Sequence, residues 1–74
     1  MPWHYHNNVQ DTFYVLQGRL RLFLREPKED VRLEPGETYT VRARRPHLVT
    51  NAGDVSAVFL VLQGLGEYDY VPLT

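Results

Sequence analysis

Hydrophobic and polar residues alternate with a period of two along most of the chain, which is typical of β-strands with one buried face. Between residues 19 and 25, Leu20, Leu22 and Leu24 share one face, while three arginines and Phe23 share the other. Residues 38–43 alternate in the same way. We predict a half-buried strand in each segment. The arginine face is interpreted as a solvated surface that discourages edge-to-edge association, in preference to a recognition surface.

Two further segments, residues 12–16 and 57–62, are apolar on both faces, as central or inter-sheet strands would be. No segment has convincing helical spacing. Turn signals separate the strands: Gln17-Gly18, residues 26–30, Pro35-Gly36 in the order of a type II turn, Arg45-Pro46 and residues 51–54. Many short strands with polar turns between them predict an all-β sandwich or small barrel.

Composition narrows the classes of partner. The 74 residues suffice for one domain, predicted over residues 1–74. Eight Lys plus Arg oppose nine Asp plus Glu, so we expect neither nucleic acid nor an anionic membrane as the main partner. The longest apolar run has six residues, far short of a membrane span, and no secretory signal is recognised. Without cysteine there is no disulfide, thiolate nucleophile or Cys-ligated zinc, and we predict a cytoplasmic location.

The short chain raises the question of what stabilises it. A domain of this size buries only about 60–65% of its unfolded surface, so such domains often depend on a metal, a partner subunit or very regular packing. We therefore expect either a bound metal or a second copy of the chain, and we predict a homodimer.

The three histidines are the clearest candidates for chemistry. His4 and His6 are two residues apart, so on a strand both imidazoles point to the same face. Asp11 follows after a short polar stretch, and His47 comes about forty residues later. Neutral imidazoles and a carboxylate form a ligand set for divalent zinc, iron, manganese, nickel or copper. The alternative is that these are ordinary solvated histidines, and the spacing alone does not decide between the two.

Two linked motifs give the sequence a resemblance to the cupins. The first reads His4-Tyr5-His6, then Asp11, then Gly18 seven residues later. The second begins at Gly36 and ends with His47 and Asn51 at the family spacing. The resemblance implies a small antiparallel β-barrel, the jelly-roll-like double-stranded β-helix. It also implies that the two motifs' histidines and carboxylate converge inside the barrel around a divalent metal.

The sequence departs from the family pattern in three places. Asp11 stands where the family usually has Glu, one methylene longer, and Gln10 beside it is an alternative ligand or water-orienting group. Arg42 and Arg44 replace the usual Pro and Gly of the second motif. The strand that usually precedes the first histidine is missing. Three explanations stay open: a barrel shortened at its N-terminus, a partner subunit that completes it, or a natural chain that begins upstream of Met1.

Alternation also suggests a wall around the metal and a contact for its ligand. The candidates for the wall are Phe13, Val15, Tyr39, Val41 and Val49, for which ordinary core packing is the alternative. A basic cluster of Arg42, Arg44 and Arg45 could bring one guanidinium, Arg44 being our candidate, to the barrel mouth to bind a carboxylate or phosphate. The alternative for this cluster is a solvated turn.

The resemblance indicates the fold more clearly than the reaction, since cupins include enzymes, binding proteins and storage proteins. The leading hypothesis is a metal-binding cupin that acts on, or binds, a small polar organic ligand. The alternatives are a non-catalytic binding or regulatory module, for example for a sugar or an acid, and a structural barrel in which metal only stabilises folding. Whether the protein is an enzyme stays open, and no catalytic residue is assigned.

Overall fold

The computed structural model describes residues 3–73, so the predicted domain bounds, residues 1–74, extend beyond it at both ends. The described residues contain strands and no helix, and therefore no helix that could span a membrane. The strands are β1 (His4–Tyr5), β2 (Asp11–Gln17), β3 (Leu20–Leu24), β4 (Glu29–Leu33), β5 (Thr38–Val41), β6 (His47–Asn51), β7 (Val58–Gln63) and β8 (Val71–Pro72).

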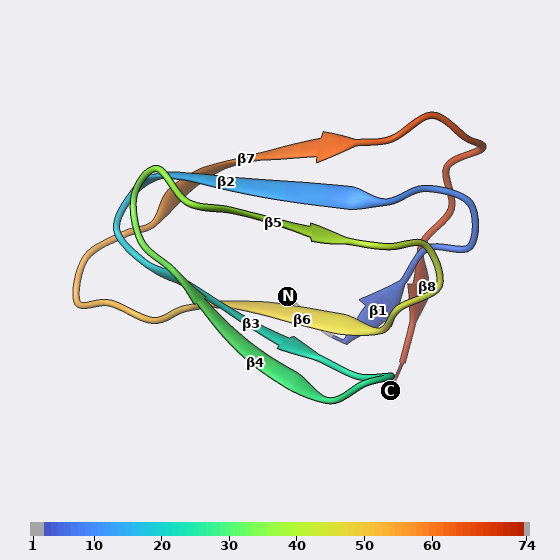
Figure 1. Cartoon of the computed structure of the whole chain (residues 1–74), viewed down its shortest axis with the longest axis horizontal. Helices are drawn as coiled ribbons and strands as arrows, with labels where there is room; N and C mark the ends of the chain where they lie inside the picture. The colour runs from blue at the N-terminus through green and yellow to red at the C-terminus, as the bar shows by residue number, and fades with distance from the viewer. Residues whose placement is uncertain (1–2, 74) are drawn as a thin grey trace.

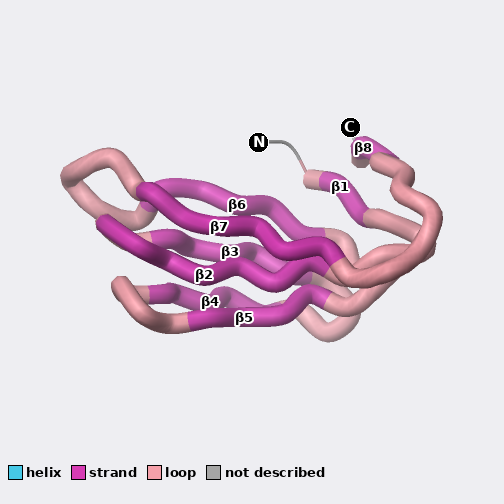
Figure 2. The backbone as a smooth tube through the Cα atoms, turned by 90° about the horizontal axis from the view of Figure 1, so that it is seen from above, coloured by secondary structure: helices cyan, strands magenta, loops and turns pink. Residues whose placement is uncertain are grey.

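The strands form two sheets that face each other, as Figures 1 and 2 show. One sheet has the order β4-β3-β6-β1-β8, and the other has the order β5-β2-β7. Neighbouring strands are antiparallel throughout. This architecture confirms the prediction of an all-β fold of the small antiparallel barrel or jelly-roll type.

The hydrophobic core lies between the two sheets. Leu20, Leu22 and Leu24 are each at most 1% exposed, which confirms the predicted buried face of β3. Alternation places their neighbours Arg21 and Phe23 on the outer face, where the guanidinium lies over the ring. The other buried residues that pack together with them are Phe13, Val15, Leu33, Val41 and Val49.

Strand β7 differs from its prediction. Its apolar sequence predicts a central or inter-sheet strand, but β7 lies at the edge of the three-stranded sheet, where only β2 pairs with it. Val58, Leu60, Val61 and Leu62 are each more than 40% exposed. An apolar run is compatible with a buried strand or an uncovered edge, and only the neighbouring strands distinguish the two.

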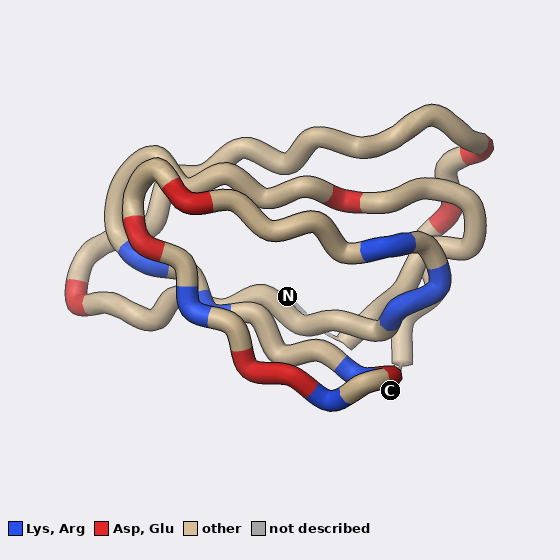
Figure 3. Tube along the Cα trace, viewed as in Figure 1, with Lys and Arg blue, Asp and Glu red and all other residues tan. Residues whose placement is uncertain are grey.

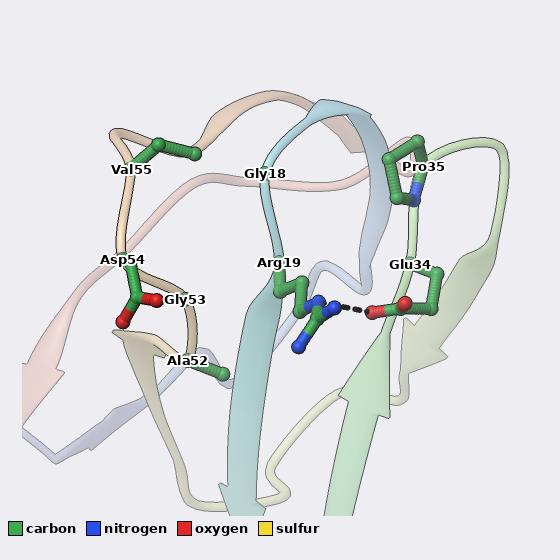
Figure 4. A pocket seen from close by; sticks show the side chains of 8 residues that line it. All are labelled: Gly18, Arg19, Glu34, Pro35, Ala52, Gly53, Asp54 and Val55. Atoms are coloured by element: carbon green, nitrogen blue, oxygen red, sulfur yellow. Dashed lines mark ion pairs between the residues drawn. The ribbon is translucent and has the colours of Figure 1, made fainter.

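The β2–β3 and β4–β5 turns and the β6–β7 loop lie at one end of the molecule (Figure 1). Gly18 takes the positive φ expected of the β2–β3 turn, +74°. Gly36 takes +88°, and the amide of Glu37 donates to the carbonyl of Glu34, which confirms the turn at Pro35-Gly36. A surface crevice of about 430 Å³ lies among these turns, with an exposed ion pair between Arg19 and Glu34 at 3.1 Å (Figure 4).

Charged residues are distributed unevenly (Figure 3). They gather on the β3–β4 hairpin, where Arg21 and Asp30 form an ion pair, and on the loop that follows β5. Strand β7 carries no charged residue.

Candidate metal centre

Three separate segments bring the candidate ligands to the end of the molecule opposite the β2–β3 and β4–β5 turns (Figure 1). His4 lies in β1 and His6 just after it, Asp11 begins β2, and His47 begins β6. The backbone pairing of β1 with β6 places His4 directly opposite His47. All four side chains are buried, and each offers a ligand atom within 4.8 Å of the others.

Asp11 lies at the centre of the cluster. Its Oδ2 is 3.1 Å from Nε2 of His6 and 3.5 Å from Nε2 of His47. The aspartate, although shorter than the usual glutamate, therefore reaches two imidazoles. Among the described residues, Oδ1 of Asp11 and Nε2 of His47 are buried with no hydrogen-bond partner. Buried polar atoms rarely remain unsatisfied, and both of these atom types are metal ligands.

The other ring nitrogens of two histidines are held by backbone carbonyls. Nδ1 of His47 donates to the carbonyl of Arg45 at 2.9 Å, and Nδ1 of His6 donates to the carbonyl of Asp69. A proton on Nδ1 leaves the lone pair on Nε2, the nitrogen that faces the cluster. This arrangement, in which a carbonyl fixes the orientation of the imidazole, is the usual outer shell of a histidine metal site.

Burial also favours the ligating form of His47. The side chain is 1% exposed, and its removal from water lowers the pKa of the imidazole from its ordinary value of 6.5. The neighbouring His4 lowers it further, against the opposing effects of the Arg45 carbonyl and Asp11. The neutral imidazole, which is the metal-binding form, is therefore favoured near neutral pH.

The C-terminal segment, residues 67–73, closes one side of the cluster. Strand β8 pairs with β1, and the ring of Tyr70 stacks on His4 with centroids 4.8 Å apart. The Asp69 carboxylate accepts hydrogen bonds from the side chain and backbone amide of Asn7, at 2.7 and 2.8 Å. These bonds lower the pKa of Asp69. The sequence interpretation missed this segment, and the aromatic Tyr68-Asp69-Tyr70 run was the only signal that pointed to it.

A cavity of about 210 Å³ adjoins the cluster. Of the predicted wall residues, only Phe13 lines it. Val15, Val41 and Val49 belong to the core and Tyr39 packs against that core, in accordance with the alternative of core packing. Gln10 is exposed. The residues that line the cavity are His4, His6, Asp11, Phe13, Val61, Gln63, Tyr68 and Tyr70.

The three arginines of the basic cluster lie apart from the cavity lining. Arg42 and Arg44 are exposed, and the guanidinium of Arg42 donates to the carbonyl of Glu26. Arg45 is buried and bound to Glu29, Tyr39 and the carbonyls of Arg25 and Pro27. The guanidinium of Arg45 therefore holds the β3–β4 hairpin against the loop before β6, while its carbonyl orients His47.

Arg44 shows how this loop departs from the family pattern. Its φ is +67°, a left-handed conformation that favours glycine, at the position where the cupin motif usually has glycine. Its amide donates to the carbonyl of His6, which connects the loop before His47 to the segment that carries the first two candidate ligands. The turn therefore keeps a conformation suited to glycine although an arginine occupies it.

Comparison with known proteins agrees with this geometry. No curated protein sequence matches the chain. The family model described as the cupin domain matches residues 1–68, which include both sequence motifs and all four clustered side chains. The chain therefore belongs to the cupin family.

Proposed function

We propose that this protein is a metal-binding cupin whose four-residue cluster holds one divalent transition metal beside a small polar organic ligand. His4, His6 and His47 would provide imidazole nitrogens, and Asp11 a carboxylate oxygen. This set suits zinc, iron, manganese, nickel or copper better than calcium or magnesium, which prefer oxygen ligands. Three imidazoles and one carboxylate leave positions open for a ligand on an ion that takes five or six donors.

One observation carries this proposal: the cluster has buried ligand atoms that nothing in the described protein satisfies. Oδ1 of Asp11 and Nε2 of His47 lack hydrogen-bond partners although both residues are less than 5% exposed. Leaving such groups unsatisfied costs about 1–3 kcal/mol each. A metal bound between them would remove this cost, and the carbonyls on the far sides of His6 and His47 already hold the rings in position.

The cavity limits the ligand to a small molecule. Its volume of about 210 Å³ lies below the usual range of about 300–1,000 Å³ for drug-sized ligands. Phe13, Tyr68 and Tyr70 provide aromatic surface, and Gln63 provides an amide that both donates and accepts hydrogen bonds. A bound metal would polarise an oxygen of such a ligand as a Lewis acid.

A non-catalytic binding module is the second candidate. Apart from the cluster itself, the described residues that line the cavity include no carboxylate, histidine, lysine or arginine. Turnover would have to rely on the metal, its own ligands or the hydroxyls of Tyr68 and Tyr70 for proton transfer, whereas simple binding requires no further group. The two candidates share the metal site and differ only in turnover.

Metal content tests the proposal directly. We expect elemental analysis of the purified protein, or titration of chelator-treated protein with the five metals, to find one ion per chain. Asp11→Asn keeps the shape but removes the anionic ligand, so the affinity for metal should fall at least tenfold. Asp30→Asn is the matched control, because Asp30 is an exposed carboxylate paired with Arg21.

The possible results separate the candidates. Absence of binding by wild-type protein, or equal affinity in the Asp11→Asn and Asp30→Asn variants, would overturn the metal site. Oxygen uptake or product formation in a screen of small carbonyl and hydroxy compounds would favour an enzyme, and saturable binding without turnover would favour the module. The predicted cytoplasmic location stays a prediction from sequence.

A further inference from the structure

A second cavity lies on the β3–β4 hairpin, apart from the metal cluster. Its volume is about 740 Å³, against about 210 Å³ for the cavity beside the cluster, and falls within the range of about 300–1,000 Å³ usual for small-molecule sites. The two cavities have no lining residue in common. Trp3 and Phe23 provide aromatic surface, and Arg25 and Lys28, in the loop between the two strands, provide positive charge. We call this cavity the hairpin groove.

Two arginines hold the aromatic rings of the hairpin groove. The guanidinium of Arg25 lies over the ring of Trp3, 4.1 Å from its centroid, and that of Arg21 lies over the ring of Phe23 at 4.5 Å. The backbone of Trp3 is fixed as well, because its carbonyl accepts a hydrogen bond from the amide of Leu73 at 2.8 Å. Both aromatic residues are half-buried, so each keeps accessible surface for a ligand. A tryptophan held in this way supplies a large stacking surface at little cost in conformational entropy.

The loop that carries the two cations is held by a buried side chain. The guanidinium of Arg45, which is 6% exposed, donates to the carbonyl of Arg25 at 3.0 Å and to the carbonyl of Pro27 at 2.8 Å. The amide of Arg25 donates to the carbonyl of Pro46 at 3.1 Å. The backbone of this loop is therefore fixed before any ligand binds, which lowers the entropic cost of binding.

The distribution of charge in the hairpin groove leaves two cations without partners. Both carboxylates that line it are already bound: Glu29 accepts a hydrogen bond from the buried guanidinium at 2.6 Å, and Asp30 accepts one from Arg21 at 2.5 Å. The hydrogen bonds from these guanidinium groups lower the pKa of both carboxyl groups. Arg25 and Lys28 form no ion pair with a carboxylate in residues 3–73. The groove therefore presents uncompensated positive charge beside aromatic surface.

We propose that the hairpin groove is a second ligand site, which binds a small aromatic anion. The ring of the ligand stacks against Trp3 and Phe23, and its phosphate or carboxylate group binds Arg25 and Lys28. Aromatic pairs in offset-stacked or edge-to-face contact gain stability beyond the area that they bury. A guanidinium binds either anion through two parallel hydrogen bonds, and an ammonium adds a compact charge. None of these contacts involves the metal cluster, so the site is independent of the function proposed above.

Fluorescence measures this binding directly, because Trp3 is the only tryptophan in the chain. We expect phenyl phosphate or phenylacetate to change the emission of Trp3 with saturation, and the tighter of the two identifies the anionic group. The ring without the anion, benzyl alcohol, and the anion without the ring, phosphate or acetate, should compete at least tenfold more weakly. Absence of saturable binding of both aromatic anions, or equal competition by either half of the ligand, would overturn the proposal.

Two double variants locate the site. Arg25→Gln/Lys28→Gln removes both cations and should weaken binding of the aromatic anion at least tenfold. Arg19→Gln/Arg32→Gln is the matched control, since it removes the same charge from exposed arginines that do not line the groove. Circular dichroism should show the wild-type spectrum for both variants, because all four side chains are exposed. Equal affinity in the two variants would refute the proposal, whereas a loss confined to the first cannot arise from the metal cluster, whose residues are unchanged in both.

Discussion

Replacement of Arg45 by lysine tests whether this buried guanidinium is the anchor that holds the loop before His47. Arg45 is 6% exposed and donates four hydrogen bonds. Nε binds the carbonyl of Arg25 at 3.0 Å and Nη1 the hydroxyl of Tyr39 at 2.9 Å. Nη2 binds both the carbonyl of Pro27 at 2.8 Å and a carboxylate oxygen of Glu29 at 2.6 Å. Lysine preserves the positive charge and loses the planar arrangement of donors.

The magnitude follows from the hydrogen bonds that lysine cannot make. A single ammonium cannot reach acceptors spread around a guanidinium, so we expect lysine to keep about two of the four hydrogen bonds. The loss of two bonds at about 0.5–1.5 kcal/mol each lowers the free energy of unfolding by about 1–3 kcal/mol. For a domain this small, with a urea dependence of roughly 1 kcal/mol per M, the unfolding midpoint should fall by about 1–3 M.

Urea unfolding of Arg45→Lys and Arg42→Lys provides the comparison. Arg42 is the matched control, because it is exposed and donates one described hydrogen bond, to the carbonyl of Glu26 at 2.7 Å. Its replacement should change the free energy of unfolding by no more than about 0.5 kcal/mol. Equal stability of the two variants would refute the reasoning, since it would mean that the buried hydrogen bonds of Arg45 contribute no more than the single exposed one of Arg42.

Three further predictions concern single positions. Arg44→Gly should raise the free energy of unfolding by about 0.5–1 kcal/mol in urea, because glycine adopts the observed φ of +67° without steric cost; a less stable variant would contradict this explanation. Gly18→Ala should destabilise the protein more than Gly36→Ala in thermal unfolding, by about 1 kcal/mol or more. Both glycines have positive φ, but of the two only Gly18 would place a Cβ 2.9 Å from a backbone oxygen, that of Ser56. Equal losses of stability in the two variants would count against the steric explanation. In chelator-treated protein the pKa of His47 in the folded state lies below its ordinary value of 6.5, so the unfolded chain takes up the proton first as the pH falls. The free energy of unfolding should therefore decrease as the pH drops below about 6.5, down to the folded-state pKa. An NMR titration midpoint at or above 6.5 for this ring would contradict the prediction.

Local patterns in the sequence predicted much of the fold. The alternation of Leu20, Leu22 and Leu24 identified the buried face of β3, and the Pro35-Gly36 order identified a turn. The spacing of His4 and His6, together with the cupin motifs, selected the side chains that the fold brings together. These features depend on neighbouring residues or on fixed spacing, so a single sequence contains them.

Other features depend on contacts between distant residues, which a single sequence does not reveal. Strands β1 and β8 have two residues each, too few for any periodicity, and they are defined by pairing across more than sixty residues. The carbonyl of Asp69 that orients His6 lies 63 positions along the chain. The ion pair between Arg45 and Glu29 could not be predicted from the sequence either. An arginine in a basic run suggests exposure to solvent or contact with an anionic ligand, and not a buried guanidinium paired with a carboxylate.

The backbone around the cluster explains how so small a protein can hold four candidate metal ligands in place. His4 and His47 face each other across paired strands, so their separation is set by sheet geometry rather than by side-chain packing. His6 lies beyond the end of β1, and its ring is held from outside by Asp69, whose carboxylate is in turn fixed by Asn7. The loop before His47 is held by the Arg45 guanidinium and by the bond from Arg44 to His6. Each of the three imidazoles is thus positioned by backbone from a different part of the chain. Residues on the exposed C-terminal segment and in the basic loop therefore matter to a cluster whose four candidate ligands are all buried.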